Sequence, residues 1–178
     1  AVIYYLEAAN KGAVPAMRNL GYILLTGERG DVDLVGARKW FSEAARHGDE
    51  IAMFRYGQMC AKGQGDRIDL MQARKWLSKA AQKGLAPAMH NYGCMLDHGQ
   101  GGPVDLVGAR KWYLEAANKG DALAMNNYGL MLHLGQGGPV DLVGARKWFL
   151  EAAQKGYAPA MINYGLILHH GHGGTVDL

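Results

Sequence analysis

The sequence has few of the side chains that carry nucleophilic chemistry. It holds two cysteines in 178 residues, Cys60 and Cys94, and they occupy different positions of the internal repeat. We therefore expect free thiols rather than a disulfide framework. No Ser-x-x-Lys and no Gly-x-Ser-x-Gly motif is present, which excludes the common serine-nucleophile sites. Aliphatic hydroxyls are confined to Thr26, Ser42, Ser78 and Thr175.

Charge of one sign and long apolar runs are also lacking. The chain has 19 basic and 16 acidic residues, a net charge of +3, which is too mild to indicate nucleic-acid binding. No apolar run approaches the roughly 20 residues of a membrane span. No signal peptide stands at the first residue. We expect neither a nucleic-acid partner nor a membrane span, and the sequence does not indicate a compartment.

What the sequence does have is an internal repeat with a period of 36 residues. The run DLVGARKW begins at Asp33, Asp105 and Asp141, and the variant DLMQARKW begins at Asp69. With 49% hydrophobic residues the chain has ample material for a core. The organisation predicted is therefore one repeat array.

Each repeat is predicted to form two helices. In the best copy Asp141 is a natural N-cap, and a first apolar stripe runs to a closing left-handed Gly156; we name this the B helix. Pro159 suits the first turn of the next helix, the A helix, which Gly171-x-Gly173 ends. The stripe of the B helix is Leu142, Ala145, Trp148, Phe149, Ala152 and Ala153, and that of the A helix is Ala160, Met161, Tyr164, Gly165 and Leu168.

Two further features of the repeat carry structural expectations. A glycine in the middle of a helix costs about 1 kcal/mol against alanine, so its recurrence predicts close approach to the paired alanines of the B helix. The Arg-Lys pair of each DLVGARKW run is expected to face water, with the lysine paired to the glutamate four residues later. The glycines are Gly21, Gly57, Gly93, Gly129 and Gly165.

These patterns, AMxNYGxxLxxGxGG followed by DLxxARKWxxEAAxxG, resemble the Sel-like repeat (SLR) family, a relative of the tetratricopeptide repeats. The resemblance covers essentially the whole chain. It implies an all-α fold, a right-handed α-α superhelix (solenoid) of helix-turn-helix repeats. Departures are few, such as Tyr4 for tryptophan, Arg29 for a loop glycine and Arg55 for asparagine.

One array over 1–178 is expected, with half repeats at 1–12 and 157–178 and whole repeats at 13–48, 49–84, 85–120 and 121–156. The sequence ends with Asp177 and Leu178, which match the first two residues of the DLVGARKW run. Neither end carries an atypical capping repeat, so we expect a piece of a longer or consensus-like array with ends open to head-to-tail self-association.

Catalytic and metal sites are not predicted. The glycine-rich loops 99–103 and 135–139 lack the lysine and preceding strand of a phosphate loop. Cysteine-rich relatives linked to penicillin binding have regular cysteine pairs that this chain lacks, so that activity is not carried over. Among seven histidines, His133 and His169 share a repeat position, but stacked equivalents lie about 9–10 Å apart, too far for one ion. We predict no metal and no cofactor.

A binding surface is predicted where the repeats differ. In the related tetratricopeptide folds the A helices line a concave groove, and their variable positions are expected to contact a partner. The same variable positions also include Leu25, Thr26, Ala61, Lys62 and Leu134. The predicted partner-binding residues are Arg18, Tyr22, Phe54, Gln58, His90, Cys94, Asp97, His98, Asn126, Asn127, Leu130, His133, Ile162, Asn163, Leu166, His169 and His170.

The asparagines beside these positions have two interpretations. By resemblance they hold the backbone of a bound peptide; alternatively they bond a neighbouring helix end or loop. They are Asn19, Asn91, Asn127 and Asn163.

The function expected is a non-enzymatic scaffold that binds a protein or an extended peptide. The alternatives are a small-molecule or cell-wall-fragment binder, or a weak hydrolase, that uses the histidines and Asp97, and a structural spacer array.

Overall fold

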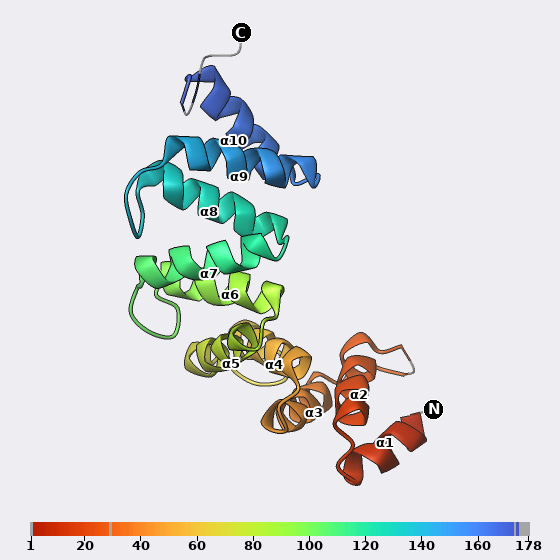
Figure 1. Ribbon diagram of the computed structural model, residues 1–178. Coiled ribbons are helices and arrows are strands. Elements are labelled where there is room, and N and C mark those ends of the chain that lie inside the picture. The colour runs from red at the N-terminus through yellow and green to blue at the C-terminus, as the bar shows by residue number, and fades with distance from the viewer. Residues whose placement is uncertain (1, 29, 173, 175–178) are drawn as a thin grey trace. The chain divides into compact units, whose positions relative to one another are not determined.

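The computed structural model describes residues 2–28, 30–172 and 174, and over these residues it is helical without strands (Figure 1). Arg29, Gly173 and the segment 175–178, with Thr175, lie outside the described residues. The predicted all-α class is confirmed. The helices are α1 Val2–Asn10, α2 Val14–Thr26, α3 Leu34–Arg46, α4 Glu50–Lys62, α5 Leu70–Gln82, α6 Ala86–Asp97, α7 Leu106–Asn118, α8 Ala122–Leu134, α9 Leu142–Gln154 and α10 Ala158–His169.

The helices fall into two compact units, Ala1–Leu85 with α1–α5 and Ala86–Leu178 with α6–α10. The A helices are α2, α4, α6, α8 and α10, and the odd-numbered helices are B helices. Each A helix from α2 to α8 packs most closely on the B helix that follows it. In the second unit the hairpins stack in chain order, with α8 on α7 and α10 on α9 (Figure 1). Among the described residues no helix combines the length and hydrophobicity needed to cross a membrane.

The start of each complete B helix is fixed by its predicted cap. The side chain of Asp141 accepts a hydrogen bond of 2.8 Å from the backbone N–H of Gly144. The aspartates Asp33, Asp69 and Asp105 make the equivalent bond at 2.8–3.0 Å. Gly156 follows α9 with a left-handed φ of 83°. The cap and stop signals read from the sequence are therefore confirmed.

The glycine in the middle of the A helix does pack closely, but its nearest neighbours are not the paired alanines. A Cβ atom at Gly129 would lie 2.7 Å from the Phe149 ring, and one at Gly93 would lie 2.8 Å from the Tyr113 ring. The A helix therefore comes closest to the B-helix residue that follows the repeated tryptophan, about one turn before the paired alanines. Phe149 and Ala153 are on the same helix face, so the apolar stripe alone did not distinguish them.

The Arg-Lys pair was predicted to face water, and this is wrong for two of its arginines. Arg38 donates to the Gln64 carbonyl at 3.3 Å and its side chain is only 12% exposed. Arg110 donates to the carbonyls of Gln136 at 3.3 Å and Pro139 at 3.0 Å. These carbonyls belong to the glycine-rich loop of the following repeat, so the arginine fastens one repeat to the next.

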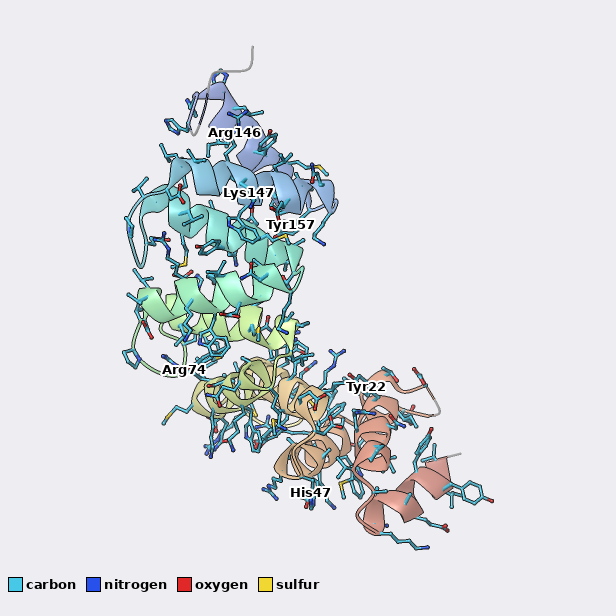
Figure 2. The ribbon with its side chains drawn as sticks, in the orientation of Figure 1. Tyr22, His47, Arg74, Arg146, Lys147 and Tyr157 are labelled. Carbon is cyan, nitrogen blue, oxygen red and sulfur yellow. The ribbon has the colours of Figure 1, made fainter. Side chains whose placement is uncertain are left out.

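The lysine of the pair behaves more nearly as expected. Lys147, labelled on α9 in Figure 2, is 70% exposed and lies 3.9 Å from Glu151. In the first whole repeat, 13–48, the pairing changes, because Glu43 contacts Arg46 at 3.3 Å and His47 at 3.7 Å. Such exposed pairs contribute little to stability.

Candidate binding surface on the A helices

Polar side chains connect consecutive A helices within each unit. Arg55 Nε on α4 donates to the Tyr22 hydroxyl on α2 at 3.0 Å. Asn163 Nδ2 on α10 donates to Asn126 Oδ1 on α8 at 2.8 Å. A third bond joins Asn127 on α8 to His90 on α6 at 3.2 Å. The repeat position predicted to hold a peptide backbone, or a neighbouring helix end, here bonds a side chain of the preceding A helix.

The first unit presents a mixed polar and aromatic surface. Arg18 donates to Asp49 at 2.8 Å, and Gln58 accepts from Arg55 at 3.3 Å. The Arg55 guanidinium also lies 5.2 Å from the centre of the Tyr22 ring and 5.7 Å from that of Phe54. A cation held over two aromatic rings is a stabilising arrangement. The predicted residues of this unit are thus brought together, partly by contacts among themselves.

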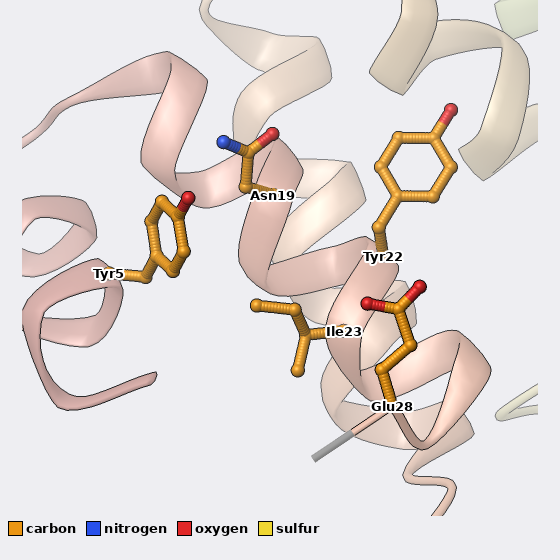
Figure 3. A pocket seen from close by; sticks show the side chains of 5 residues that line it. All are labelled: Tyr5, Asn19, Tyr22, Ile23 and Glu28. Atoms are coloured by element: carbon orange, nitrogen blue, oxygen red, sulfur yellow. The ribbon is translucent and has the colours of Figure 1, made fainter. Parts of the chain in front are cut away.

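A pocket of about 310 Å³ opens beside Tyr22. Figure 3 shows Asn19 between Tyr5 and Tyr22, with Glu28 next to Tyr22. Tyr5 comes from α1, and the other lining residues come from α2 and the turn after it. Two phenol rings, an amide and a carboxylate are a set that accepts a basic or amide side chain. Sequence reasoning missed Tyr5 and Glu28, because neither stands at a variable A-helix position.

His90 and Cys94 form the centre of a polar cluster in the second unit. His90 Nε2 lies 3.2 Å from Asn127 Nδ2 and 3.6 Å from Cys94 Sγ. His90 Nδ1 lies 3.3 Å from Asn91 Oδ1. An amide nitrogen only donates, so Nε2 accepts and Nδ1 carries the hydrogen that it donates to Asn91. This fixes the imidazole in one tautomer.

The electrostatics of this cluster favour neutral groups. Burial raises the pKa of the Cys94 thiol. Burial lowers the pKa of the His90 imidazole, although the charge of Asp121 opposes that shift. A nucleophilic cysteine needs the reverse, a thiolate beside an imidazolium. Both cysteines are free, as predicted.

Tyr113 closes the cluster from α7. Its hydroxyl lies 3.3 Å from Cys94 Sγ and 3.5 Å from Asp97 Oδ2. Burial raises the pKa of Tyr113 far above its ordinary range, so this hydroxyl stays a donor. His98, by contrast, is 66% exposed beside Asp97. Tyr113 belongs to a B helix, which is why a search of A-helix positions did not find it.

The remaining predicted residues lie on α8 and α10 and differ in exposure. Ile162 is 65% exposed and Leu166 52% exposed, whereas Asn126 is buried at 5% exposure. Asn126 therefore serves as the acceptor for Asn163 rather than as open surface. His169 is exposed, with its ring centre 5.1 Å from that of His170.

A second group of histidines lies in the second unit. His133 shares a repeat position with His169, but its ring neighbour is His172, with ring centres 5.6 Å apart. His172 stands in the loop after α10 and was not predicted. In the part of the chain that the structure describes, no three His, Cys, Asp or Glu side chains are arranged to hold a metal ion.

The Sel1 repeat family profile matches residues 1–12, 14–49, 51–85, 86–121, 122–157 and 158–178. The chain belongs to the Sel1 repeat family. No curated protein matches this sequence.

Solved structures agree with this family. The chain is similar to a protective antigen of uropathogenic Escherichia coli strains that displays an SLR fold, with 32% identity and a TM-score of 0.95 over 99% of this chain. It spans 38% of that protein. A Sel1 repeat protein from Oxalobacter formigenes has 24% identity and a TM-score of 0.87, covering 99% of this chain and 76% of that protein.

A third protein, from Klebsiella pneumoniae subsp. pneumoniae, is described as a Sel1 repeat protein. It has 24% identity and a TM-score of 0.60, covering 98% of this chain and 84% of that protein. These two less similar structures show the fold alone. The predicted Sel-like solenoid is confirmed, and Sel1 repeats are helical scaffolds that typically take part in protein interactions.

Proposed function

We propose that this Sel1 repeat array is a non-enzymatic scaffold that binds a protein or an extended peptide along its A helices. The observation that carries the proposal is the contrast between the two helices of the repeat. B-helix side chains are nearly constant between copies, whereas the A helices differ at their partly exposed positions. A surface of changing side chains on a constant frame is suited to reading a partner.

The chemistry of the A-helix surface supports a peptide partner. It offers aromatic rings at Tyr22 and Phe54, amides such as Gln58, and apolar side chains on α8 and α10. Leu134 is 59% exposed and Ile162 is 65% exposed. Aromatic and apolar anchors surrounded by polar groups are typical of protein contacts.

The same surface argues against catalysis. The His90–Cys94 pair is the nearest approach to a nucleophile and base, and its pKa shifts favour the neutral thiol and the neutral imidazole. Its imidazole nitrogens are also engaged by Asn91 and Asn127. We therefore assign this cluster to the polar contacts between α6 and α8.

A selection from a random peptide display library tests the proposal directly. Peptides selected on the wild-type chain are measured against Leu134→Ser/Ile162→Ser, which changes exposed A-helix side chains. We expect binding to weaken by about tenfold or more, because apolar anchors dominate such contacts.

The matched control changes equally exposed apolar side chains on the B helices. Val107 and Val143 are 69% and 68% exposed, and Val107→Ser/Val143→Ser should leave the selected peptides bound. Loss of binding in the control, with retention in the A-helix variant, would move the binding surface to the B helices and end the proposal.

A further inference from the structure

A pocket of about 250 Å³ lies between α8 and α10 in the second unit. It combines three imidazoles and one amide with three aliphatic side chains. The lining residues are Leu130, His133, Asn163, Leu166, Ile167, His170 and His172.

Two nitrogen atoms of the lining histidines have no protein partner. The Nδ1 atoms of His133 and His172 are buried, and no described residue hydrogen-bonds to either. The two rings lie 5.6 Å apart with planes tilted by 38°, and the His170 ring lies 5.6 Å from that of His172. Buried polar atoms in proteins are normally hydrogen-bonded, so these nitrogens leave donor or acceptor capacity unused beside the pocket, which a ligand meets when the imidazole rings turn toward the cavity.

The charge of the lining selects the kind of ligand. No carboxylate lines the pocket, so it offers nothing to balance a bound organic cation. No described group of three His, Cys, Asp or Glu side chains is arranged for a metal ion. Imidazoles donate one N–H when neutral and two when protonated. The lining is therefore suited to an anionic acceptor.

The apolar half of the pocket defines the rest of the ligand. Leu130, Leu166 and Ile167 provide aliphatic surface beside the imidazoles. The volume of about 250 Å³ falls just below the roughly 300–1,000 Å³ of pockets for drug-sized molecules. A branched hydrocarbon of the size of one leucine side chain, ending in a carboxylate, matches both halves.

The geometry points to a binding site for a small aliphatic carboxylate, with the carboxylate at His133 and His172 and the hydrocarbon at the aliphatic side chains. The carboxylate belongs either to a free short-chain acid or to the C-terminal residue of a peptide. In the second case the inference rests on the proposed function, because the pocket then anchors the end of the A-helix partner.

Isothermal titration of the full chain with three small probes tests this site. The probes are 4-methylpentanoate for a free acid, N-acetyl-leucine for a peptide end, and N-acetyl-leucinamide, which lacks the carboxylate. A carboxylate-free buffer is used, so that no buffer anion competes with the probes for the site. We expect at least one carboxylate probe to bind at one site per chain and the amide to bind at least tenfold more weakly.

Variants taken from the chain's own repeats separate binding from folding. His172→Gln introduces the residue of Gln64, Gln100 and Gln136, and His133→Leu introduces the residue of Leu25 at the same repeat position. Each should weaken carboxylate binding at least tenfold while the helical circular dichroism is unchanged. His47→Lys is the matched control on an exposed histidine at the end of a B helix, where it introduces the residue of Lys83, Lys119 and Lys155, and it should bind as the wild type does.

Several results would overturn the site. These are no heat from either carboxylate, equal binding of the amide, unchanged binding in both pocket variants, or a response to Zn²⁺ alone. Preference for N-acetyl-leucine supports the peptide end, and preference for 4-methylpentanoate supports the free acid. None of the pocket variants alters Leu134 or Ile162, so failure here leaves the peptide selection on the A-helix surface to be judged separately.

Discussion

The glycine in the middle of the A helix has different surroundings at its last two occurrences. At Gly129 an added Cβ would lie 2.7 Å from the Phe149 ring, whereas at Gly165 nothing lies within 4 Å. Gly129→Ala should therefore lower the free energy of unfolding by about 1–3 kcal/mol through overpacking. Gly165→Ala should raise it by about 0.5–1 kcal/mol, because alanine is the better helix former.

Urea unfolding followed by circular dichroism measures both changes. The two variants make the same substitution at the same repeat position, so propensity alone predicts the same sign. A stabilising Gly129→Ala would show that the Phe149 ring moves aside freely, and the close approach would then not explain the glycine.

His90 predicts a pH dependence of stability. Burial lowers the pKa of this imidazole in the folded chain, so the unfolded chain takes up the proton at higher pH. The contribution of His90 is therefore full above the ordinary imidazole pKa of about 6.5 and is lost as the pH falls toward the lower folded value.

The variant His90→Phe, which introduces the residue of Phe54 at this position, isolates that contribution. Urea midpoints are compared for both proteins from about pH 8 to about pH 5. We expect the wild type to lose stability relative to the variant as the pH falls. Since Asp121 and Asp97 are present in both proteins, a difference that stays constant with pH would contradict the burial of a neutral imidazole.

At the scale of elements, the arginine of DLVGARKW connects a B helix to the next loop. Arg110 donates to Gln136 and Pro139, at 3.3 Å and 3.0 Å. Charge-assisted hydrogen bonds of this kind contribute about 1.5–3 kcal/mol when partly buried. Arg110→Ala should lower the free energy of unfolding by about that amount and speed amide hydrogen exchange in 135–140. Lys111→Ala, one residue on and exposed, should stay within about 0.5 kcal/mol.

Hydrogen exchange measured by mass spectrometry distinguishes a local role from a general one. The expected pattern is a loop that exchanges faster while α6 keeps its protection. Equal destabilisation by the alanine variants of Arg110 and Lys111 would mean that the carbonyl bonds do not hold the loop.

The elements themselves were predictable because their signals are local. Asp141 and Gly156 mark the two ends of α9 through backbone preferences that act within a single turn. The role of Arg110 was not predictable in the same way, because its acceptor Gln136 lies 26 residues along the chain. Helical periodicity places a side chain on a face, but it does not show which loop returns to cover that face.

The candidate site was predictable in part for the same reason. Variation between repeats identified His90, Cys94 and His133, which stand on A helices. It did not identify His172, because this residue follows α10 in a loop and approaches His133 at a spacing different from the repeat period. Tyr113 was missed because it lies on the constant B helix, although its hydroxyl completes the cluster around Cys94.

At the scale of the whole molecule, the array divides into two compact units, Ala1–Leu85 and Ala86–Leu178. The bond from Asn127 to His90 and the bond from Asn163 to Asn126 connect α6, α8 and α10 within the second unit. Repeat arrays are stabilised by contacts between neighbouring elements rather than by contacts across the whole chain. A separate fragment 86–178 should therefore fold and keep the histidine pocket.

Circular dichroism and thermal unfolding of this fragment check that expectation. We expect helical spectra, one cooperative transition and the same carboxylate affinity as the full chain. A shorter fragment, 106–178, is the control, because it removes α6 and with it the partner of Tyr113 and Asn127. It should melt broadly and at lower temperature. If 86–178 were unfolded instead, neighbour contacts would be insufficient, and the stability of the array would have to be a property of all its repeats together.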